Sequence, residues 1–332
     1  MDGNGRGGSD GSSAREATVA VIGLGTIAAT HLRVIAARSD LTVAFGVDPH
    51  RSELPGRYGF PRYASLGEGL ASSVPLDLVV VATPTDSHVA LVEEALASTH
   101  ALVLSEKPLT RSPSDLEHLR RHFPDATARL RVAHHFAFSP EVRWAARTHR
   151  AWSARGGPTR IVSVFNDPYI RKTARERASY VTSWIDSGPN QLTMLRRFVD
   201  GFDVVGHSQD VEGLRSATRL TYDGGDAYLL SNWLTGDSSK QTTLSYSDGS
   251  EIRMDHTSMT GVALASSGEI EHFGNDGRTD RKVAHYAALY ECLLSDASHD
   301  LIALPLAAET TALLAAAADI VSRPSRVSWL IG

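Results

Sequence analysis

The stretch "ATVAVIGLGTIAATHLRVIAARS", residues 17–39, constrains the fold more than any other part of the sequence. It opens with an apolar run rich in β-branched residues, turns at Gly23 and Gly25, and continues with apolar residues at helical spacing. A buried strand that leads directly into a helix is the first half of a crossover unit, the connection that parallel strands require. The chain therefore begins as an α/β domain with a parallel sheet.

The same strand–turn–helix design recurs downstream. Further apolar runs that are followed by polar turns, most of them with a helical stretch after the turn, lie at 41–50, 76–99, 100–123 and 128–138. Strands that alternate with helices predict a sheet with both faces covered. We expect a Rossmann dinucleotide-binding domain over residues 17–138.

The sequence changes character after residue 138. Longer alternating runs, with hairpin turns such as "YDGGD" and "SDGS", are typical of an antiparallel sheet. We expect strands within 159–167, 202–209, 215–235, 240–258 and 326–331, and helices at 281–297 and 304–322. Residues 139–332 should thus form an α+β domain with a large, mainly antiparallel open sheet that binds substrate and forms the oligomer.

Charge and composition exclude several classes of protein. The formal net charge over 332 residues is −5, without a basic run, which argues against a nucleic-acid partner. No apolar run is long enough to span a membrane. Cys292 is the only cysteine, so no intrachain disulfide or cysteine-based zinc site can form, and no other spacing predicts a metal. We expect a cytoplasmic protein whose residues 1–16, rich in Gly and Ser, form a disordered tail.

Gly23, Gly25 and Ala28 have the G-x-G-x-x-G/A spacing of dinucleotide-binding turns. Gly23 permits the tight turn, Gly25 lets the backbone approach a pyrophosphate, and Ala28 lets the helix pack on the strand. The pyrophosphate would lie at the helix start, at Thr26 and Ile27, because free N–H groups and the helix dipole favour an anion there. Small residues at this spacing can also serve packing alone, but the strand before and the helix after favour a nucleotide.

Asp48 ends the next strand, in "FGVDPH". A carboxylate at this position accepts hydrogen bonds from a ribose 2′-OH and repels the additional phosphate of NADP. We therefore expect NAD as the cofactor in preference to NADP, although Arg51 lies nearby and would weaken that preference. The alternative is that Asp48 only caps a turn before Pro49.

The stretch "SWIDSGPNQLTML", residues 183–195, places Asp186 and Asn190 four positions apart, on one face if a helix starts there. The stretch alone favours a helix cap, with Asp186 or Ser187 as the cap and Pro189 in the first turn. The alternative is a pair of site residues. Asp186 would carry charge, and Asn190 would donate and accept hydrogen bonds.

Three motifs in this order make the chain resemble the Gfo/Idh/MocA oxidoreductases, the family of glucose–fructose oxidoreductase and inositol dehydrogenase. They are "TPTDSHVALVEEAL", "HALVLSEKPLT" and the Asp186 stretch, and the resemblance covers nearly all of the chain after the tail. "EKP" after a buried strand is the most specific motif, and His31 also falls where the family commonly has a histidine.

The resemblance implies roles for the matching residues. The nicotinamide half of the cofactor would be lined by Thr83, Pro84 and Thr85, with His88 opening the following helix and Glu106 near the nicotinamide ribose. Lys107 would project into the cleft beside the reacting carbon. Partial desolvation beside a cationic nicotinamide should lower the pKa of Lys107, so that it can exchange a proton with the substrate. A solvated surface lysine is the weaker alternative, since the chain has only Lys107, Lys172, Lys240 and Lys282.

The family's acid-x-Gly-x-His element matches at Asp186 and Gly188, but Asn190 replaces the histidine. An amide cannot act as the general base, so the proton would pass to Lys107, or to Asp186 if burial raises its pKa. His134 and His135 end the last predicted strand of the Rossmann domain, where neighbours face opposite ways, so at most one faces the site. The predicted substrate contacts are His135, Tyr169, Tyr180, Trp184, Asp186 and Asn190.

These observations predict an NAD(H)-dependent oxidoreductase acting on CH–OH or C=N groups. Its substrate would be a polyhydroxylated or amino-substituted small molecule such as a sugar, cyclitol or nucleoside, and a ketone or imine reductase of specialised metabolism is one variant. The alternatives are a non-catalytic NAD-dependent regulatory protein and an enzyme that recycles NAD internally, as epimerases do. Like the family, the chain is expected to form a homodimer or homotetramer through its C-terminal sheet.

Overall fold

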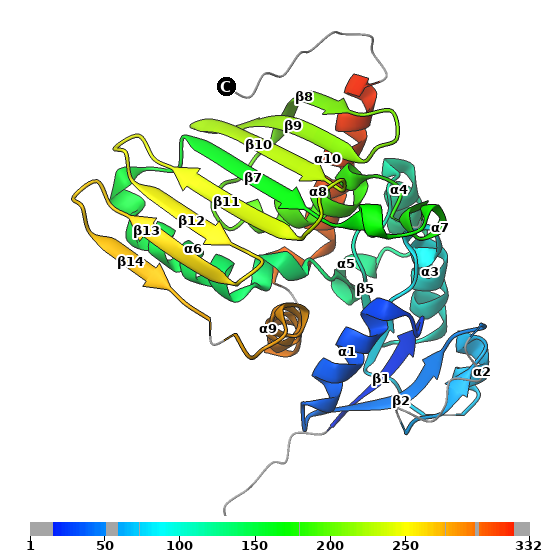
Figure 1. Ribbon diagram of the computed structural model, residues 1–332. Helices are drawn as coiled ribbons and strands as arrows, with labels where there is room; N and C mark the ends of the chain where they lie inside the picture. The colour runs from blue at the N-terminus through cyan, green and yellow to red at the C-terminus, as the bar shows by residue number, and fades with distance from the viewer. Residues whose placement is uncertain are drawn as a thin grey trace, which may run out of the picture.

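The computed structural model describes residues 16–50, 59–72, 74–178, 180–275, 277–295 and 299–321. Two sheets lie at opposite ends of the molecule, with helices between and around them (Figure 1). All but the last residue of the predicted N-terminal tail, and the predicted strand at 326–331, lie outside the described residues.

The first sheet has six parallel strands in the order β3-β2-β1-β4-β5-β6. The strands are β1 (Ala17–Ile22), β2 (Leu41–Val47), β3 (Arg62–Tyr63), β4 (Leu78–Val81), β5 (Leu102–Ser105) and β6 (Leu130–Val132). The helices are α1 (Thr26–Ala36), α2 (Leu66–Leu70), α3 (His88–Ser98), α4 (Pro113–His122) and α5 (Ala126–Arg129), with a 3₁₀ turn, η1 (Thr85–Ser87), before α3. The strand order reverses between β1 and β4, which is where such sheets bind ligands.

The second sheet has eight strands in the order β14-β13-β12-β11-β7-β10-β9-β8, antiparallel except for the β7–β10 pair. The strands are β7 (Arg160–Asn166), β8 (Asp203–Gln209), β9 (Arg215–Tyr222), β10 (Gly225–Asn232), β11 (Ser239–Ser245), β12 (Glu251–Asp255), β13 (Thr260–Leu264) and β14 (Ile270–Phe273). The predicted fold class is confirmed. The sequence analysis did not identify β3, β13 and β14.

Helices cover one face of the second sheet. They are α6 (Pro140–Ala151), α8 (Ser183–Leu195) and α10 (Leu304–Val321), with shorter segments η3 (Ser153–Arg155), η4 (Tyr169–Arg171) and α7 (Ala174–Ala178) at its ends. Alternating residues of the strands point toward these helices and form a core that includes Phe165, Leu220 and Leu244, each fully buried. Figure 1 shows the opposite face of the sheet without a covering helix.

Helix α9 (Arg281–Ser295) lies against α1 of the first sheet. Its buried residues Tyr286, Leu289 and Tyr290 share a core with Val19 and Leu32. After η5 (Asp300–Ile302), α10 likewise places residues in the core on the other face of the first sheet. The chain thus returns to the first sheet after completing the second, which brings α9 beside the Gly-rich turn.

The segment 128–138 is only briefly a strand, contrary to the sequence prediction. β6 pairs with β5 over three residues at the edge of the sheet, and the chain then turns into η2 (His135–Phe138). The amides of His134 and His135 donate to the carbonyls of Val132 and Ala133, at 2.9 and 2.8 Å, which ends the extended conformation. No helix in the described part of the chain is both long and apolar enough to cross a membrane.

Candidate active site

A cavity of about 570 Å³ lies between the carboxyl edge of the first sheet and α8, α9 and β7, a volume typical of small-molecule sites. It brings together most of the residues that the sequence analysis selected. Those on its wall are Gly25, Thr26, Ile27, Thr83, Pro84, Thr85, His88, Glu106, Lys107, His135, Tyr169, Tyr180, Asp186 and Asn190. Gly23, Asp48 and Trp184 do not line it.

The Gly-rich turn has the shape that a dinucleotide requires. Gly23 has φ +84°, and a Cβ there would lie 2.6 Å from Cγ2 of Thr83 and 2.8 Å from the carbonyl oxygen of Ala82. Gly25 differs, because no atom lies within 4 Å of the position of its missing Cβ. Gly25 is the N-cap of α1, with no side-chain cap and no acidic residue in the first turn. The amides of Thr26 and Ile27 therefore suit a pyrophosphate of NAD.

Substitutions of these two glycines should affect different properties, cofactor binding at Gly25 and thermal stability at Gly23. Gly25→Val should fold with an unchanged melting temperature but weaken NADH binding at least about 10-fold, because its side chain would occupy the space of the pyrophosphate. Gly23→Val should lower the melting temperature, since φ is positive and the turn is crowded. Thermal unfolding and NADH fluorescence titration check both effects. Unweakened NADH binding in folded Gly25→Val would exclude a cofactor at this turn.

Asp48 uses both carboxylate oxygens. Oδ2 accepts from the Leu24 amide at 3.0 Å and so supports the Gly-rich turn, while Oδ1 accepts from the His50 amide at 2.9 Å. The second bond is the turn cap that the sequence analysis gave as the alternative. A ribose contact by Asp48 stays a prediction, and Arg51 lies outside the described residues.

Glu106 is almost fully buried behind Lys107, at 6% exposure. Its Oε1 accepts from the Tyr286 hydroxyl and lies 3.0 Å from Nε2 of His31, whose Nδ1 lies 2.9 Å from the Tyr290 hydroxyl. Burial by itself would raise the pKa of Glu106, but the bonds to His31 and Tyr286 and the charge of Lys107 outweigh it and the pKa is lowered. The buried carboxylate joins α1 and α9 under the cavity, while its contact with the nicotinamide ribose stays a prediction.

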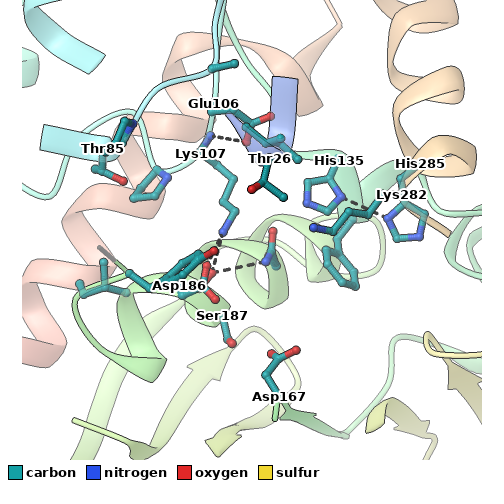
Figure 2. Close-up of a pocket in the computed structure, with 18 of the residues that line it drawn as sticks. Thr26, Thr85, Glu106, Lys107, His135, Asp167, Asp186, Ser187, Lys282 and His285 are labelled. Carbon is teal, nitrogen blue, oxygen red and sulfur yellow. Dashed lines mark hydrogen bonds and ion pairs between the residues drawn. The ribbon is translucent and has the colours of Figure 1, made fainter. Parts of the chain in front are cut away.

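Lys107 spans the cavity from the end of β5 to α8. Its Nζ donates to Oδ1 of Asp186 and to the carbonyl oxygen of Asp186, both at 2.9 Å (Figure 2). The hydroxyl of Tyr169 donates to the other carboxylate oxygen at 3.1 Å. The structure thus places an ammonium, a carboxylate and a phenol together, although Lys107 and Asp186 lie 79 residues apart in the sequence.

The prediction that burial would make Asp186 a base with a raised pKa is wrong. Burial does act to raise that pKa, but the charge and hydrogen bond of Lys107, the charge of Lys240 and the hydrogen bond of Tyr169 lower it overall. Asp186 is therefore a carboxylate that holds Lys107.

The alternative interpretation of Asp186 or Ser187 as a helix cap is wrong. Helix α8 starts earlier, and its N-cap is Thr182, whose hydroxyl accepts from the Ile185 amide at 3.2 Å. Pro189 consequently lies inside the helix rather than in its first turn. Asp186 is free to face the cavity because it is not needed as the cap.

Asn190 has one free polar atom in the cavity. Its Nδ2 donates to the carbonyl of Asp186 at 3.3 Å, whereas its Oδ1 is buried and has no hydrogen-bond partner among the residues that the structure describes. A buried acceptor of this kind is costly unless a ligand donates to it. The position of Asn190 is thus consistent with its predicted contact to a substrate hydroxyl or amine.

Asn190→His tests whether this side chain faces the reacting group. The new imidazole would add a titratable group beside Lys107, so the pH dependence of kcat should gain an ionisation near 6.5. Steady-state rates between pH 5 and 9 measure it, and Thr193→His, one turn further along α8, controls for a buried histidine elsewhere. An unchanged pH profile in folded Asn190→His would assign the residue to α8 packing alone.

His135 faces the cavity and His134 does not, as predicted, but the reason differs. The two residues enter η2 instead of continuing a strand, and His134 bonds the Leu301 carbonyl at 3.0 Å. Nδ1 of His135 lies 3.1 Å from Nδ1 of His285. Burial and the neighbouring positive charges hold the pKa of His135 well below its usual value, and burial lowers that of His285 to about 3. Both imidazoles are thus neutral.

Two further site predictions need correction. Trp184 is a core residue at 2% exposure, and its ring covers Gly188, where a Cβ would approach within 2.7 Å. It cannot contact substrate from there. His88 has both ring nitrogens within 2.9 Å of the carbonyls of Pro108 and Thr83, so it joins two loops of the cavity and has no nitrogen left for the cofactor.

Several residues on the cavity wall were not predicted. They include Asp167, Lys172, Lys240, Arg281, Lys282 and His285. The scarcity of lysine was the available signal, because all four lysines of the chain line this one cavity. Within the described residues, no cluster of His, Cys, Asp and Glu side chains has the arrangement of a metal site.

Comparisons with known proteins agree with this architecture. Residues 17–134 match the family described as "Oxidoreductase family, NAD-binding Rossmann fold" (Gfo/Idh/MocA). No curated protein matches the chain.

Solved structures show the same fold over most of the chain. An oxidoreductase from Agrobacterium radiobacter, in complex with NAD+, L-tartaric acid and magnesium, is 18% identical, with a TM-score of 0.78 over 93% of this chain and 97% of that one. An inositol dehydrogenase homolog from Azotobacter vinelandii, complexed with NADH and myo-inositol, is 17% identical, with a TM-score of 0.77 over 94% and 97%. GenD2 from gentamicin A biosynthesis, in complex with NAD, is 18% identical, with a TM-score of 0.77 over 93% and 95%.

The matched residues include the Gly-rich turn, the Thr83–Thr85 loop and the Glu106–Lys107 pair, all of which border the cavity or support it. Residues 17–134 thus match the model of an oxidoreductase family with an NAD-binding Rossmann fold, and the rest of the chain shares its fold with the solved structures.

Proposed function

We propose that the protein is an NAD(H)-dependent reductase of a ketone or imine on a polyhydroxylated or amino-substituted small molecule. The observation that carries this proposal is the Lys107–Asp186 ion pair, which lies in one cavity with the N-terminus of α1. Of the structures with a similar fold, one is complexed with NADH and myo-inositol, and another is GenD2 from gentamicin A biosynthesis. Sugars, cyclitols and aminosugars are therefore the substrates to test first.

The chain's own residues favour reduction over oxidation. NAD(H), when bound, supplies the hydride donor or acceptor. Nζ of Lys107 donates hydrogen bonds to Asp186, which orients it in the cavity, and it would donate a proton to the substrate oxygen or nitrogen as a negative charge develops there. Alcohol oxidation needs a base instead, and Asn190 cannot provide one.

Asn190 and Tyr169 would orient the substrate on either side of Asp186. Oδ1 of Asn190 would accept from a substrate hydroxyl or amine, while Tyr169 and Tyr180 would form the outer wall. Burial and the charges of Asp186 and Asp167 raise the pKa of Tyr169, so it acts as a hydrogen-bond donor and not as a base.

Turnover measurements test the proposal. Purified protein with NADH or NADPH is given a panel of keto-sugars, keto-cyclitols and amine–ketone pairs, and absorbance at 340 nm is followed. We expect net NADH consumption, with NADH preferred over NADPH because of Asp48. Turnover of substrate without net NADH loss would favour internal recycling. NADH binding without any turnover would favour a regulatory protein.

We also propose assembly through the second sheet, as a homodimer or homotetramer. The face opposite α6, α8 and α10 has no covering helix (Figure 1), and β9 to β12 expose side chains on it. Light scattering after size exclusion gives the mass directly, and a monomer at micromolar concentration would contradict this assembly.

A further inference from the structure

The charges around the cavity are opposite in sign to those of the whole chain. The chain has a net charge of −5. The cavity wall carries five cationic side chains, Lys107, Lys172, Lys240, Arg281 and Lys282, against the three carboxylates Glu106, Asp167 and Asp186. The excess of positive charge is thus concentrated where a ligand would bind.

Each of the three carboxylates is already engaged. Asp186 pairs with Lys107, Asp167 pairs with Lys240, and Glu106 accepts from Tyr286 and lies against His31. These pairs account for two of the five cationic side chains, so three remain: Lys172, Arg281 and Lys282.

Lys172 lies over two aromatic rings. Its Nζ lies 5.0 Å from the ring centre of Tyr169 and 5.3 Å from that of Tyr180, within the range of cation–π attraction. Arg281 also lies over a ring, that of Phe136, but its Nη1 is buried without a hydrogen-bond partner among the described residues. Neither Arg281 nor Lys282 forms an ion pair or hydrogen bond with another side chain in the described part of the molecule.

Arg281 and Lys282 begin α9, and His285 follows one turn later. The Arg281 guanidinium lies 5.6 Å from the ring centre of Phe136, with its Nη1 buried and unpartnered. His285 is fully buried, and its Nε2 also has no partner. Figure 2 shows Lys282 extending from α9 toward the centre of the cavity, on the side across from Asp186. Arg281, Lys282 and His285, all from the first turns of α9, thus bring to the cavity wall three nitrogen groups for which the described residues supply no hydrogen-bond partner.

This arrangement is costly in the free protein. Lys282 is open to solvent at the cavity mouth, yet desolvation by the cavity wall and the charges of Arg281 and Lys107 lower its pKa. Glu106 and Asp186 act in the opposite direction on Lys282, but both carboxylates are already engaged with other groups. Like charges held close together repel, and a bound anion would relieve that repulsion. Positive residues at the start of a helix also oppose its dipole, so helix stability does not explain them.

We propose that the substrate carries a carboxylate, bound by Arg281 and Lys282 with His285 behind them, at the end of the cavity across from Asp186. This inference rests on the proposed function and adds the substrate class, a sugar acid or cyclitol acid. The planar guanidinium matches the two oxygens of a carboxylate, and Lys282 adds a second charge. The reacting carbon would then lie between this anion site and Lys107.

Matched acids and amides test the inference. The NADH-saturated protein is titrated by calorimetry with D-gluconate and D-gluconamide, with D-glucuronate and D-glucuronamide, and with glucose 6-phosphate and glucose. We expect at least one carboxylate to bind about 10-fold or more tightly than its amide, the scale of one charge-assisted hydrogen bond. In Lys282→Gln, whose exposed side chain leaves the fold unaffected, that ratio should fall at least about threefold. Arg281→Lys should reduce it too, because the paired N–H donors are lost.

Arg147→Gln is the control, since it removes one positive charge from an exposed position of α6 outside the cavity. It should keep the preference for the acid. The inference is overturned if no carboxylate binds more tightly than its amide, if Lys282→Gln keeps the full ratio, or if only the phosphate ester is preferred. Titration with NADH alone tests the proposed function separately from the anion site. If NADH does not bind, the proposed function fails. The binding of acid and amide can still be compared without cofactor, so the anion site is tested in either case.

Discussion

Lys107→Met is expected to lower kcat about 100- to 10,000-fold, the range for loss of a general acid. The variant keeps a side chain of similar length but cannot donate a proton or pair with Asp186. NADH affinity should change little, because the Gly-rich turn that receives the pyrophosphate is made by other residues. Steady-state kinetics and NADH fluorescence titration measure the two effects separately.

The control for this variant is Arg147→Gln, which also removes one positive charge and should retain the wild-type rate. Lys107→Arg adds a second comparison: its guanidinium keeps the charge but does not release a proton near neutral pH, so kcat should stay low. Turnover near the wild-type rate in Lys107→Met would show that Lys107 takes no part in the reaction. It would also show that Asp186 does not act through its ion pair with Lys107.

Glu106→Ala is expected to lower the free energy of unfolding by about 2–5 kcal/mol, because two buried groups lose their acceptor at a cost of roughly 1–3 kcal/mol each. The substitution leaves the Tyr286 hydroxyl and Nε2 of His31 without their acceptor, and both residues are fully buried. Urea unfolding followed by tryptophan fluorescence measures the change. Glu94→Ala, at an exposed position of α3, should change stability by less than about 0.5 kcal/mol.

The stability difference between wild type and Glu106→Ala should depend on pH in one direction. The pKa of Glu106 is lowered in the folded protein, so its carboxylate stabilises the fold fully above the ordinary glutamate pKa of about 4.3. That contribution is lost as the pH falls through the lower folded pKa. The difference between wild type and Glu106→Ala should therefore be constant near pH 7 and shrink below about pH 4. A difference that grows toward acidic pH would contradict the assigned charge state.

Local chemistry was sufficient to predict the first half of the site. Gly23 and Gly25 are recognisable because a tight turn and a close ligand approach each require glycine within a few residues of one another. The first sheet followed for the same reason, since each strand and its helix are adjacent in the sequence. β13 and β14 were missed because they are short strands in a stretch without a strong hairpin signal.

Contacts between distant residues were not predictable from local chemistry. Lys107 and Asp186 were selected together only through resemblance to a family, and nothing in their neighbouring residues indicates that they meet. The helix cap was misassigned because Asp186, Ser187 and Pro189 together imitate a helix start, while the true cap, Thr182, lies upstream. Arg281, Lys282 and His285 belong to a helix whose local sequence reads as an ordinary amphipathic segment. Only the return of α9 to the first sheet makes them part of the cavity.

The central claim is that hydride passes between the bound cofactor and a carbon held beside Lys107. The most direct measurement uses NADH deuterated at C4 of the nicotinamide, in separate samples for each face, with the substrate panel above and mass spectrometry of the products. We predict that deuterium from one face appears on one product carbon, in amounts equal to the NADH consumed. Product without deuterium, or deuterium returned to the cofactor with no net NADH loss, would contradict the claim.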